Sequence, residues 1–158
     1  IGKEDTQINS IVVDKISYRL PTLADAAHTA LNLQPDDMKE VIDGSGMHPV
    51  LAIARSVVAI YTVVFETPDG KIVAMAGIDD TGCIWMLSTN EVRNHPIAFM
   101  RALKRWLDSL PHKLHYNIAD IRNVAHLKLL KHLGYKFLRV IPTGPNNLYF
   151  IEFVKLKR

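Results

Sequence analysis

The segment that decides the fold runs from His115 to Phe137 and reads HYNIADIRNVAHLKLLKHLGYKF. Within it, apolar residues recur at the spacing of one helical face: Val124, Leu127, Leu130 and Leu133. This spacing predicts an amphipathic helix over about Asp120 to Leu133. Gly134 follows the last apolar turn, where a glycine commonly supplies the left-handed residue that ends a helix. A strand is therefore expected to begin at once, at Tyr135.

The second half of the chain continues as an alternation of strands and helices. Pro96, a favourable first residue of a helix, precedes apolar residues at helical spacing as far as Leu110. Apolar and β-branched runs bounded by turn residues predict the strands of this half. These strands are expected over Leu114 to Ile118, from Tyr135 to the turn at Pro142, and over Leu148 to Val154.

Three apolar runs in the middle of the chain are separated by two short turn sequences. The separators read TPDG at Thr67–Gly70 and DDTG at Asp79–Gly82, and turns this short can join only antiparallel strands. An antiparallel meander is therefore predicted over Ile60 to Glu66, Lys71 to Ile78 and Cys83 to Ser88. Upstream, the sequence predicts a strand over Ile16 to Leu20 and helices over Leu23 to Leu31, from Pro35 to just before Gly44, and from Pro49 to about Val57.

This order of elements predicts the fold class. A meander followed by β-α-β-α-β-β gives an α/β (α+β) domain with a mixed, mostly antiparallel sheet and helices on both faces. Residues 1–10 are polar and aperiodic, so we expect a mobile N-terminal segment, followed by a single domain over residues 11–158. The chain begins at Ile1 instead of methionine, which is consistent with trimming or processing.

Composition places the chain among globular proteins. Hydrophobic residues make up 48% and charged residues 22%, which is ordinary for a globular domain. The longest apolar stretch, Met47 to Phe65, is interrupted by Pro49 and Arg55 and does not read as a membrane span. Cys83 is the single cysteine, so an internal disulfide is excluded and a buried structural thiol is expected. We therefore expect a cytoplasmic protein.

The pattern Asn123-x-x-Ala, Leu-Leu, then Leu-Gly134-Tyr resembles the segment that closes the coenzyme A site in the GNAT superfamily of N-acetyltransferases. Gly134 lies eleven residues after Asn123, as the resemblance requires. The resemblance implies a GNAT-like sheet with a splayed parallel strand pair and an asparagine that hydrogen-bonds the pantetheine arm. Four residues before the glycine, where a tyrosine often serves as general acid, this chain has Leu130.

A narrower resemblance concerns tailed phages. The sequence from Trp85 onward looks like a phage family of acetyltransferase-like proteins, some of them internal virion proteins. That resemblance covers about Ile16 to Lys155. It implies a location in the cytoplasm of the host cell or in the virion.

Ligands of such sheets bind where neighbouring parallel strands lead into helices, which here is near Ser88 and Ala119. The resemblance implies that the backbone of Met86, Leu87 and Ser88 faces the pantetheine and acyl group of acetyl-CoA or another acyl-CoA, while Asn123 holds the arm. The following loop, from Thr89 to Ala98, has no glycine for a pyrophosphate. Its candidate cofactor-binding residues are Arg93, His95 and Ile97.

Charge supports a phosphate-bearing ligand only in part. Residues 1–50 carry eight acidic and four basic side chains, and the remaining 108 carry eight acidic and fifteen basic ones. The basic second half suits coenzyme A, but it is equally typical of a solvated surface. The sequence has no nucleic-acid-binding signature, so we do not expect nucleic acid as a partner.

Amine acylation needs a base for the ammonium group and an acid for the leaving thiolate. Tyr116 and Ser88 are the catalytic candidates, because Leu130 cannot supply a proton. Other groups near the same strand ends are His115 and Asn117, with Asp79, Asp80 and Glu91 as candidate bases. Neither His112 with His115 nor any cysteine cluster predicts a metal, and His126 and His132 read as solvated or hydrogen-bonded helix residues.

Two functions follow from these observations. The first is an acyl-CoA-dependent N-acyltransferase, or acyltransferase-like phage protein, that transfers an acyl group directly from a coenzyme A thioester to an amine. The second is a catalytically inactive protein of the same fold that acts in virion assembly or host interaction. Leu130 and the loop without glycine favour the second function, and the segment from Asn123 to Gly134 favours the first.

Overall fold

The computed structural model describes residues 15–46 and 61–158. The predicted mobile segment over residues 1–10 and the helix predicted from Pro49 to Val57 lie outside the described residues. Among the described helices, none is both long and apolar enough to cross a membrane.

The first sheet is an antiparallel meander that confirms the prediction for the middle of the chain. Its strand order is β1-β2-β3-β4. Gly70 has a φ of 85° in the β2–β3 turn and Gly82 a φ of 97° in the β3–β4 turn, which is backbone that glycine adopts without strain. The strands are β1 (Ser17–Arg19), β2 (Tyr61–Glu66), β3 (Ile72–Ile78) and β4 (Ile84–Ser88).

The second sheet contains the three remaining strands, in the order β5-β7-β6. The last strand along the chain lies between the other two and pairs antiparallel with both. The two sheets touch at one parallel bridge between Cys83 and Tyr116, so β4 and β5 form the expected splayed parallel pair. The strands are β5 (Leu114–Asp120), β6 (Lys136–Thr143) and β7 (Leu148–Leu156).

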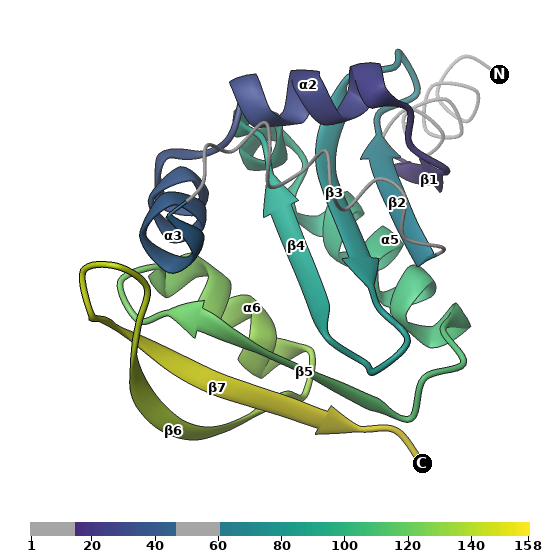
Figure 1. Ribbon diagram of the computed structural model, residues 1–158. Coiled ribbons are helices and arrows are strands. Elements are labelled where there is room, and N and C mark those ends of the chain that lie inside the picture. Colours follow the sequence, from purple (N-terminus) through teal and green to yellow (C-terminus); the bar gives the residue numbers. More distant parts are fainter. Residues whose placement is uncertain (1–14, 47–60) are drawn as a thin grey trace, which may run out of the picture.

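Helices cover both faces of the strands, which confirms the predicted fold class. Figure 1 shows α2 on the near side of the first sheet and α5 and α6 behind the strands. Ala26 of α2 packs with Val64 of β2, whereas Phe65 packs on the other face, 5.4 Å from Phe99 of α5 between ring centroids. The helices are α2 (Leu23–Leu31), α3 (Pro35–Ser45), η1 (Asn90–Asn94, a 3₁₀ helix), α5 (Pro96–Ser109) and α6 (Val124–His132).

Helix α6 begins four residues later than the apolar spacing predicts. Asp120 still belongs to β5, and its carboxylate accepts the backbone N–H of Arg122 in the turn that follows. Asn123 is the residue that caps the helix, because its side-chain oxygen accepts the N–H of His126. The helical spacing of the apolar residues could not distinguish these two candidate caps, since both residue types favour helix starts.

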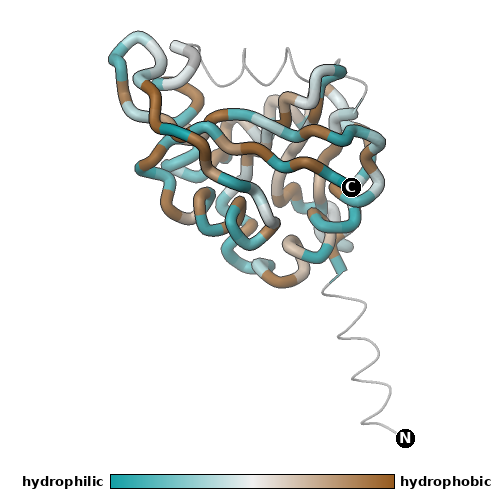
Figure 2. The backbone as a smooth tube through the Cα atoms, turned by 90° about the horizontal axis from the view of Figure 1, so that it is seen from below, coloured by the Kyte–Doolittle hydropathy of each residue, from teal (hydrophilic) through white to brown (hydrophobic). Residues whose placement is uncertain are grey.

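The end of α6 agrees with the sequence. Gly134 has a φ of 89°, and the N–H of Tyr135 bonds the carbonyl of Leu130, so the chain leaves the helix in a left-handed turn. Tyr135 then enters the core beside Phe153 of β7, with 5.3 Å between ring centroids. Figure 2 shows hydrophobic and hydrophilic residues interspersed along the strand that leads to the C-terminus. Phe150 and Phe153 are the buried residues of this strand.

The contact between the two sheets depends on Gly82. A Cβ atom on Gly82 would lie 2.1 Å from the carbonyl oxygen of Leu114, whereas a Cβ on Gly70 would meet nothing within 4 Å. We therefore expect Gly70→Ala to lower the free energy of unfolding by about 1–2 kcal/mol, the cost of the left-handed backbone alone. Gly82→Ala should cost roughly 3–5 kcal/mol, because the backbone of β5 must also move. Urea denaturation measures both, and equal losses would contradict this view of the junction.

Candidate functional site

Strands β4 and β5 begin in contact and then separate. The N–H of Tyr116 donates to the carbonyl of Gly82 at 2.9 Å, and one residue further the side chain of Asn117 donates to the carbonyl of Ile84 at 2.6 Å. Beyond Ile84 the two strands belong to separate sheets. We call the space between the separating strands the fork.

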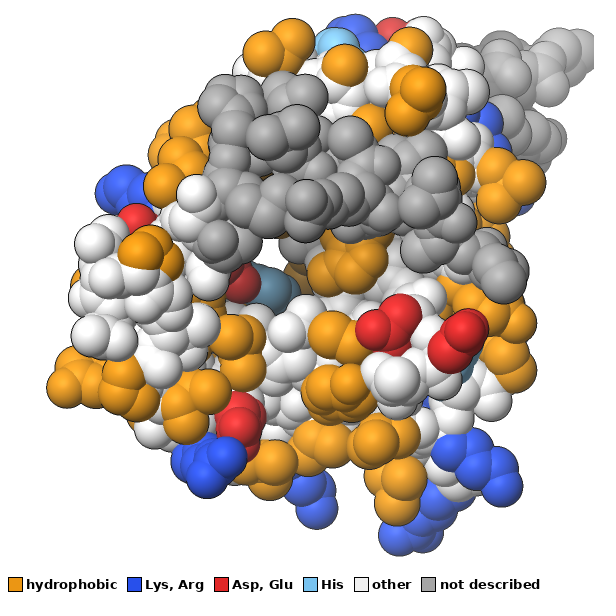
Figure 3. All heavy atoms as spheres, in the orientation of Figure 1, with side chains coloured by type: hydrophobic (Ala, Val, Ile, Leu, Met, Phe, Trp, Pro, Cys, Tyr) orange, Lys and Arg blue, Asp and Glu red, His pale blue; other side chains and the backbone are white. Residues whose placement is uncertain are grey.

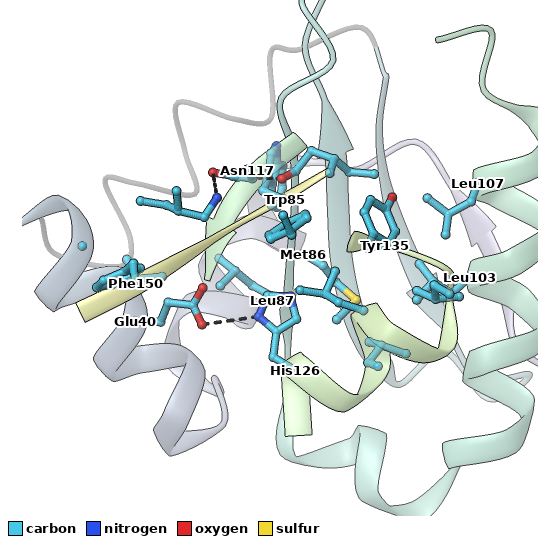
Figure 4. A pocket seen from close by; sticks show the side chains of 18 of the residues that line it. Glu40, Trp85, Met86, Leu87, Leu103, Leu107, Asn117, His126, Tyr135 and Phe150 are labelled. Atoms are coloured by element: carbon cyan, nitrogen blue, oxygen red, sulfur yellow. Dashed lines mark hydrogen bonds and ion pairs between the residues drawn. The ribbon is translucent and has the colours of Figure 1, made fainter. Parts of the chain in front are cut away.

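The fork holds a cavity of about 300 Å³. The walls are mostly apolar, and Glu40, Asn117 and His126 are polar residues among them. Figure 3 shows the molecule hollowed at its centre on this side, with acidic and histidine side chains inside the hollow. Figure 4 shows the lining from close by. The apolar walls come from β4 (Trp85, Met86, Leu87), α5 (Leu103, Trp106, Leu107), α6 (Leu129, Leu130, Leu133) and β7 (Phe150, Phe153), with Tyr135 beside them.

Helix α3 joins the far ends of the two strands through Asp37. One carboxylate oxygen of Asp37 accepts both the N–H and the hydroxyl of Ser88 at 2.8 Å, and the other accepts the side-chain amide of Asn123 at 2.9 Å. All three residues are less than a tenth exposed. A buried carboxylate is stable only when it is hydrogen-bonded, so this arrangement fixes the end of β4 relative to the start of α6.

The first residues of α3 are anchored to the same place. The backbone N–H of Gln34 donates to the carbonyl of Ser88 at 3.0 Å, and its side-chain amide donates to the Ser88 hydroxyl oxygen at 2.8 Å. Pro35 then begins the helix, as its fixed φ favours. The position of Asp37 therefore follows from the anchoring of Gln34 to β4.

Glu40, one turn after Asp37, pairs with His126 of α6 at the cavity wall. Its Oε2 lies 3.4 Å from Nδ1 of His126 and also accepts the side-chain amide of Asn123 at 3.1 Å. Burial alone would lower the pKa of His126, but the hydrogen bond and charge of Glu40, with the charge of Asp37, raise it above its ordinary value. The contact with Glu40 therefore favours the protonated form of His126.

The structure brings four of the predicted site residues to the fork. Met86 and Leu87 line the cavity, and Ser88 and Asn123 meet at Asp37 although they lie far apart in the sequence. The side chains of Ser88 and Asn123 are occupied by hydrogen bonds within the protein.

Tyr116, the predicted catalytic tyrosine, lies at the closed end of the fork. Its hydroxyl is 2.7 Å from the hydroxyl of Thr81 in the β3–β4 turn, and 37% of the residue is exposed. Asp79, a candidate base, accepts the N–H groups of Thr81 and Cys83 in the same turn. The side-chain hydrogen bond from Thr81 is the main reason that the pKa of Asp79 is lowered.

The predicted pyrophosphate loop is a 3₁₀ turn that uses its own amides. The N–H groups of Val92 and His95 bond the carbonyls of Thr89 and Val92, respectively. Arg93 donates to the side chain of Gln34 at 3.1 Å, and His95 lies 3.3 Å from Glu91. Ile97, at the start of α5, is exposed.

The sequence did not indicate Asp37 or Glu40, and it predicted a solvated or hydrogen-bonded helix residue at His126 without identifying Glu40 as its partner. One signal was present: two acidic residues three apart on the face of a helix that also carries apolar residues. Acidic side chains on such a face must find partners when the face is buried. Among the described residues, no group of three histidine, cysteine or acidic side chains could hold a metal ion.

Comparison with known proteins identifies the fold. No family profile and no curated protein sequence matches this chain. Solved structures do match, among them yncA, a putative acetyltransferase from Salmonella typhimurium with acetyl-CoA, at 12% identity and a TM-score of 0.67 over 91% of this chain and 95% of that one. A GNAT acetyltransferase from Streptococcus agalactiae matches at 11% identity and a TM-score of 0.68, over 90% and 96%.

A third match is the microcin C7 self-immunity acetyltransferase MccE in complex with acetyl-CoA and AMP, at 15% identity and a TM-score of 0.62, over 92% of this chain and 94% of that one. At this level of identity the similarity shows the fold, and this chain has the fold of GNAT acetyltransferases. The GNAT fold predicted from the segment between Asn123 and Gly134 is confirmed.

Asp37 should matter more for stability than its neighbour on the same helix turn. Asp37→Ala leaves the buried N–H of Ser88 and the amide of Asn123 without their acceptor, so we expect the free energy of unfolding to fall by about 2–4 kcal/mol. Asp36→Ala is the matched control, because Asp36 is exposed in the same first turn; we expect a change below about 1 kcal/mol. If urea denaturation gave similar losses of unfolding free energy for Asp37→Ala and Asp36→Ala, the Asp37 hydrogen bonds would not contribute to stability.

Buried His115 should make the protein sensitive to acid. Burial, and then the positive charge of Lys157, lowers the pKa of His115 to about 4, and its Nδ1 lies 3.0 Å from the Tyr135 hydroxyl. His115 therefore binds a proton near pH 6.5 in the unfolded chain but only near pH 4 in the folded chain. The free energy of unfolding must fall as the pH falls from 6.5 to about 4.

We expect the unfolding free energy of His115→Gln to depend less on pH between 7 and 4.5 than that of the wild type. His132→Gln, which alters an exposed histidine, should keep the wild-type slope. Parallel curves for the wild type and His115→Gln would reject the assignment.

Proposed function

We propose that this protein transfers an acyl group from a coenzyme A thioester directly to an amine, with no covalent enzyme intermediate. The observation that carries the proposal is the cavity of about 300 Å³ in the fork of a GNAT fold. Among the described strands, β4 pairs only with β3, so alternate residues direct backbone N–H and C=O groups toward the fork. Such an edge accepts an extended ligand that carries amides of its own.

The pantetheine arm has the required chemistry, since it is extended and contains two amide groups. We assign the backbone of Met86, Leu87 and Ser88 to the arm and the acyl group, and the amide of Asn123 to the arm. Arg93, His95 and the N–H of Ile97 at the start of α5 are assigned to the pyrophosphate. Arg93 and His95 would exchange their contacts with Gln34 and Glu91 for the phosphates. Tyr116 and Ser88 stay predictions as catalytic residues.

The second candidate is a GNAT-fold protein without catalysis, which acts in virion assembly or host interaction. Two observations favour it: Leu130 lines the cavity where an acid would be needed, and the loop before α5 bonds its amides internally. The finer assignment, to the tailed-phage family of internal virion proteins, is supported by the sequence from Trp85 onward.

Isothermal titration with acetyl-CoA and hexanoyl-CoA separates the two functions. Under the transferase proposal we expect a dissociation constant tighter than about 100 μM, or about 5.5 kcal/mol of binding free energy. Met86→Trp should abolish binding by filling the fork, whereas Leu138→Trp, at an exposed position of β6, should leave it unchanged. A wild-type protein that binds neither thioester would reject the transferase in favour of the second candidate.

The same titration tests Asn123. Asn123→Ala should weaken binding about tenfold through the loss of one hydrogen bond to the arm. Asp37→Ala removes the hydrogen-bond partner of Asn123 but keeps its amide. Comparing the two variants therefore distinguishes the loss of a direct contact between Asn123 and the arm from a general loosening of the network. Unchanged affinity in Asn123→Ala would reject our placement of the arm.

A further inference from the structure

We propose that Glu40 and His126 form the proton-transfer pair of the fork, with His126 as the catalytic acid and Glu40 as the residue that orients it. This inference rests on the proposed acyl transfer and adds the residues that carry its protons. It adds this pair to the predicted catalytic residues Tyr116 and Ser88, whose hydroxyls lie within hydrogen-bond distance of Thr81 and Asp37 in the observed arrangement.

The geometry fixes the direction of the imidazole. Figure 4 shows Glu40 and His126 pointing toward one another at the wall of the cavity, beside Leu87. Because Nδ1 of His126 lies against Oε2 of Glu40 at 3.4 Å, Nε2 is the nitrogen left for a ligand in the fork. Asn123 donates to the same Oε2 and so holds the carboxylate in place. A histidine oriented by a carboxylate is a common arrangement for proton transfer.

The surroundings of His126 favour its protonated form. The charged groups that face it are Glu40 and Asp37, both on α3, and β7 contributes the uncharged ring of Phe153 at 6.3 Å between centroids. Together the two carboxylates outweigh the effect of burial and raise the pKa of the imidazole. The two carboxylates therefore favour the imidazolium, the form that can donate a proton.

Position supports the same role. His126 lies one helical turn before Leu130, and both line the cavity. Of the ionisable side chains among the described residues of the lining, Tyr135 is a poor alternative, because burial raises its pKa and its hydroxyl bonds His115. His126, oriented by Glu40, is thus the lining group best placed to donate a proton into the cavity.

The lone pair of the neutral amine forms the new C–N bond at the thioester carbonyl carbon, and the C–S bond breaks with its electron pair on sulfur. Nε2 of the His126 imidazolium gives its proton to that sulfur, which leaves as the free thiol of coenzyme A. The acylated nitrogen then returns its surplus proton to Nε2, so the pair ends in its initial state.

The test measures release of free coenzyme A from acetyl-CoA and hexanoyl-CoA with spermidine and Nα-acetyl-lysine as amine acceptors. We expect His126→Gln to lower kcat about 10²-fold or more, while the thioester dissociation constant stays within about threefold. His132→Gln, on the same helix but exposed, is the control and should match the wild type. Because the imidazolium is the acid, activity should fall as pH rises through its pKa. Glu40→Gln should move that alkaline limb to lower pH.

Proton NMR of the histidine ring signals gives a readout independent of turnover. The His126 pKa should drop in Glu40→Gln and stay unchanged in Glu91→Gln, which alters a carboxylate on η1. A wild type that turns over acyl-CoA while His126→Gln is equally fast would overturn the pair alone and leave the transferase proposal standing. A wild type that binds no acyl-CoA would overturn both, and a His126 pKa unaffected by Glu40→Gln would remove the orienting role of Glu40.

Discussion

The structure depends on the contact between the β3–β4 turn and the start of β5. Gly82 brings its backbone against Leu114 and accepts the N–H of Tyr116, and from that point β4 and β5 diverge. Among the described residues each strand has its other edge paired, β4 with β3 and β5 with β7. Backbone groups that face the space between the strands need a partner, and Asp37 and Gln34 supply one for the N–H and the carbonyl of Ser88. A closed start and an open end thus create the fork from two ordinary sheets.

Helix α3 keeps the open end at a fixed width. At its beginning Gln34 and Asp37 bond Ser88 of β4, and near its end Asp43 lies 2.6 Å from Arg122, which also pairs with Asp120 of β5. The helix therefore spans the fork from one strand end to the other. Ion pairs at partly exposed positions contribute little individually. Here the ion pairs hold α3 in position, and the same helix places Glu40 in the cavity wall.

The sequence predicted the elements of this architecture better than their assembly. Gly134 and Pro96 marked helix ends through backbone requirements that are local and strong. The insertion of β7 between β5 and β6 could not be derived in the same way, because pairing of distant strands leaves no trace in local periodicity. Asp37 and Glu40 were not predicted for a related reason, because an acidic residue is expected to face solvent unless its partners are known. Here the partners are Ser88, Asn123 and His126, which come from distant parts of the sequence.

Two parts of the candidate site differ in how ready they are for a ligand. The fork has a mostly apolar wall, but the groups at its far end, the Ser88 N–H and the Asn123 amide, are hydrogen-bonded to Asp37. The loop before α5 would have to release the contacts of Arg93 and His95 before either side chain reached a phosphate. Each such exchange contributes about 1 kcal/mol or less to the free energy of binding, since one hydrogen bond replaces another. Under the proposed function, recognition of a coenzyme A thioester would therefore depend mainly on the apolar cavity at the pantetheine and acyl end, whose wall α3 helps to form through Glu40.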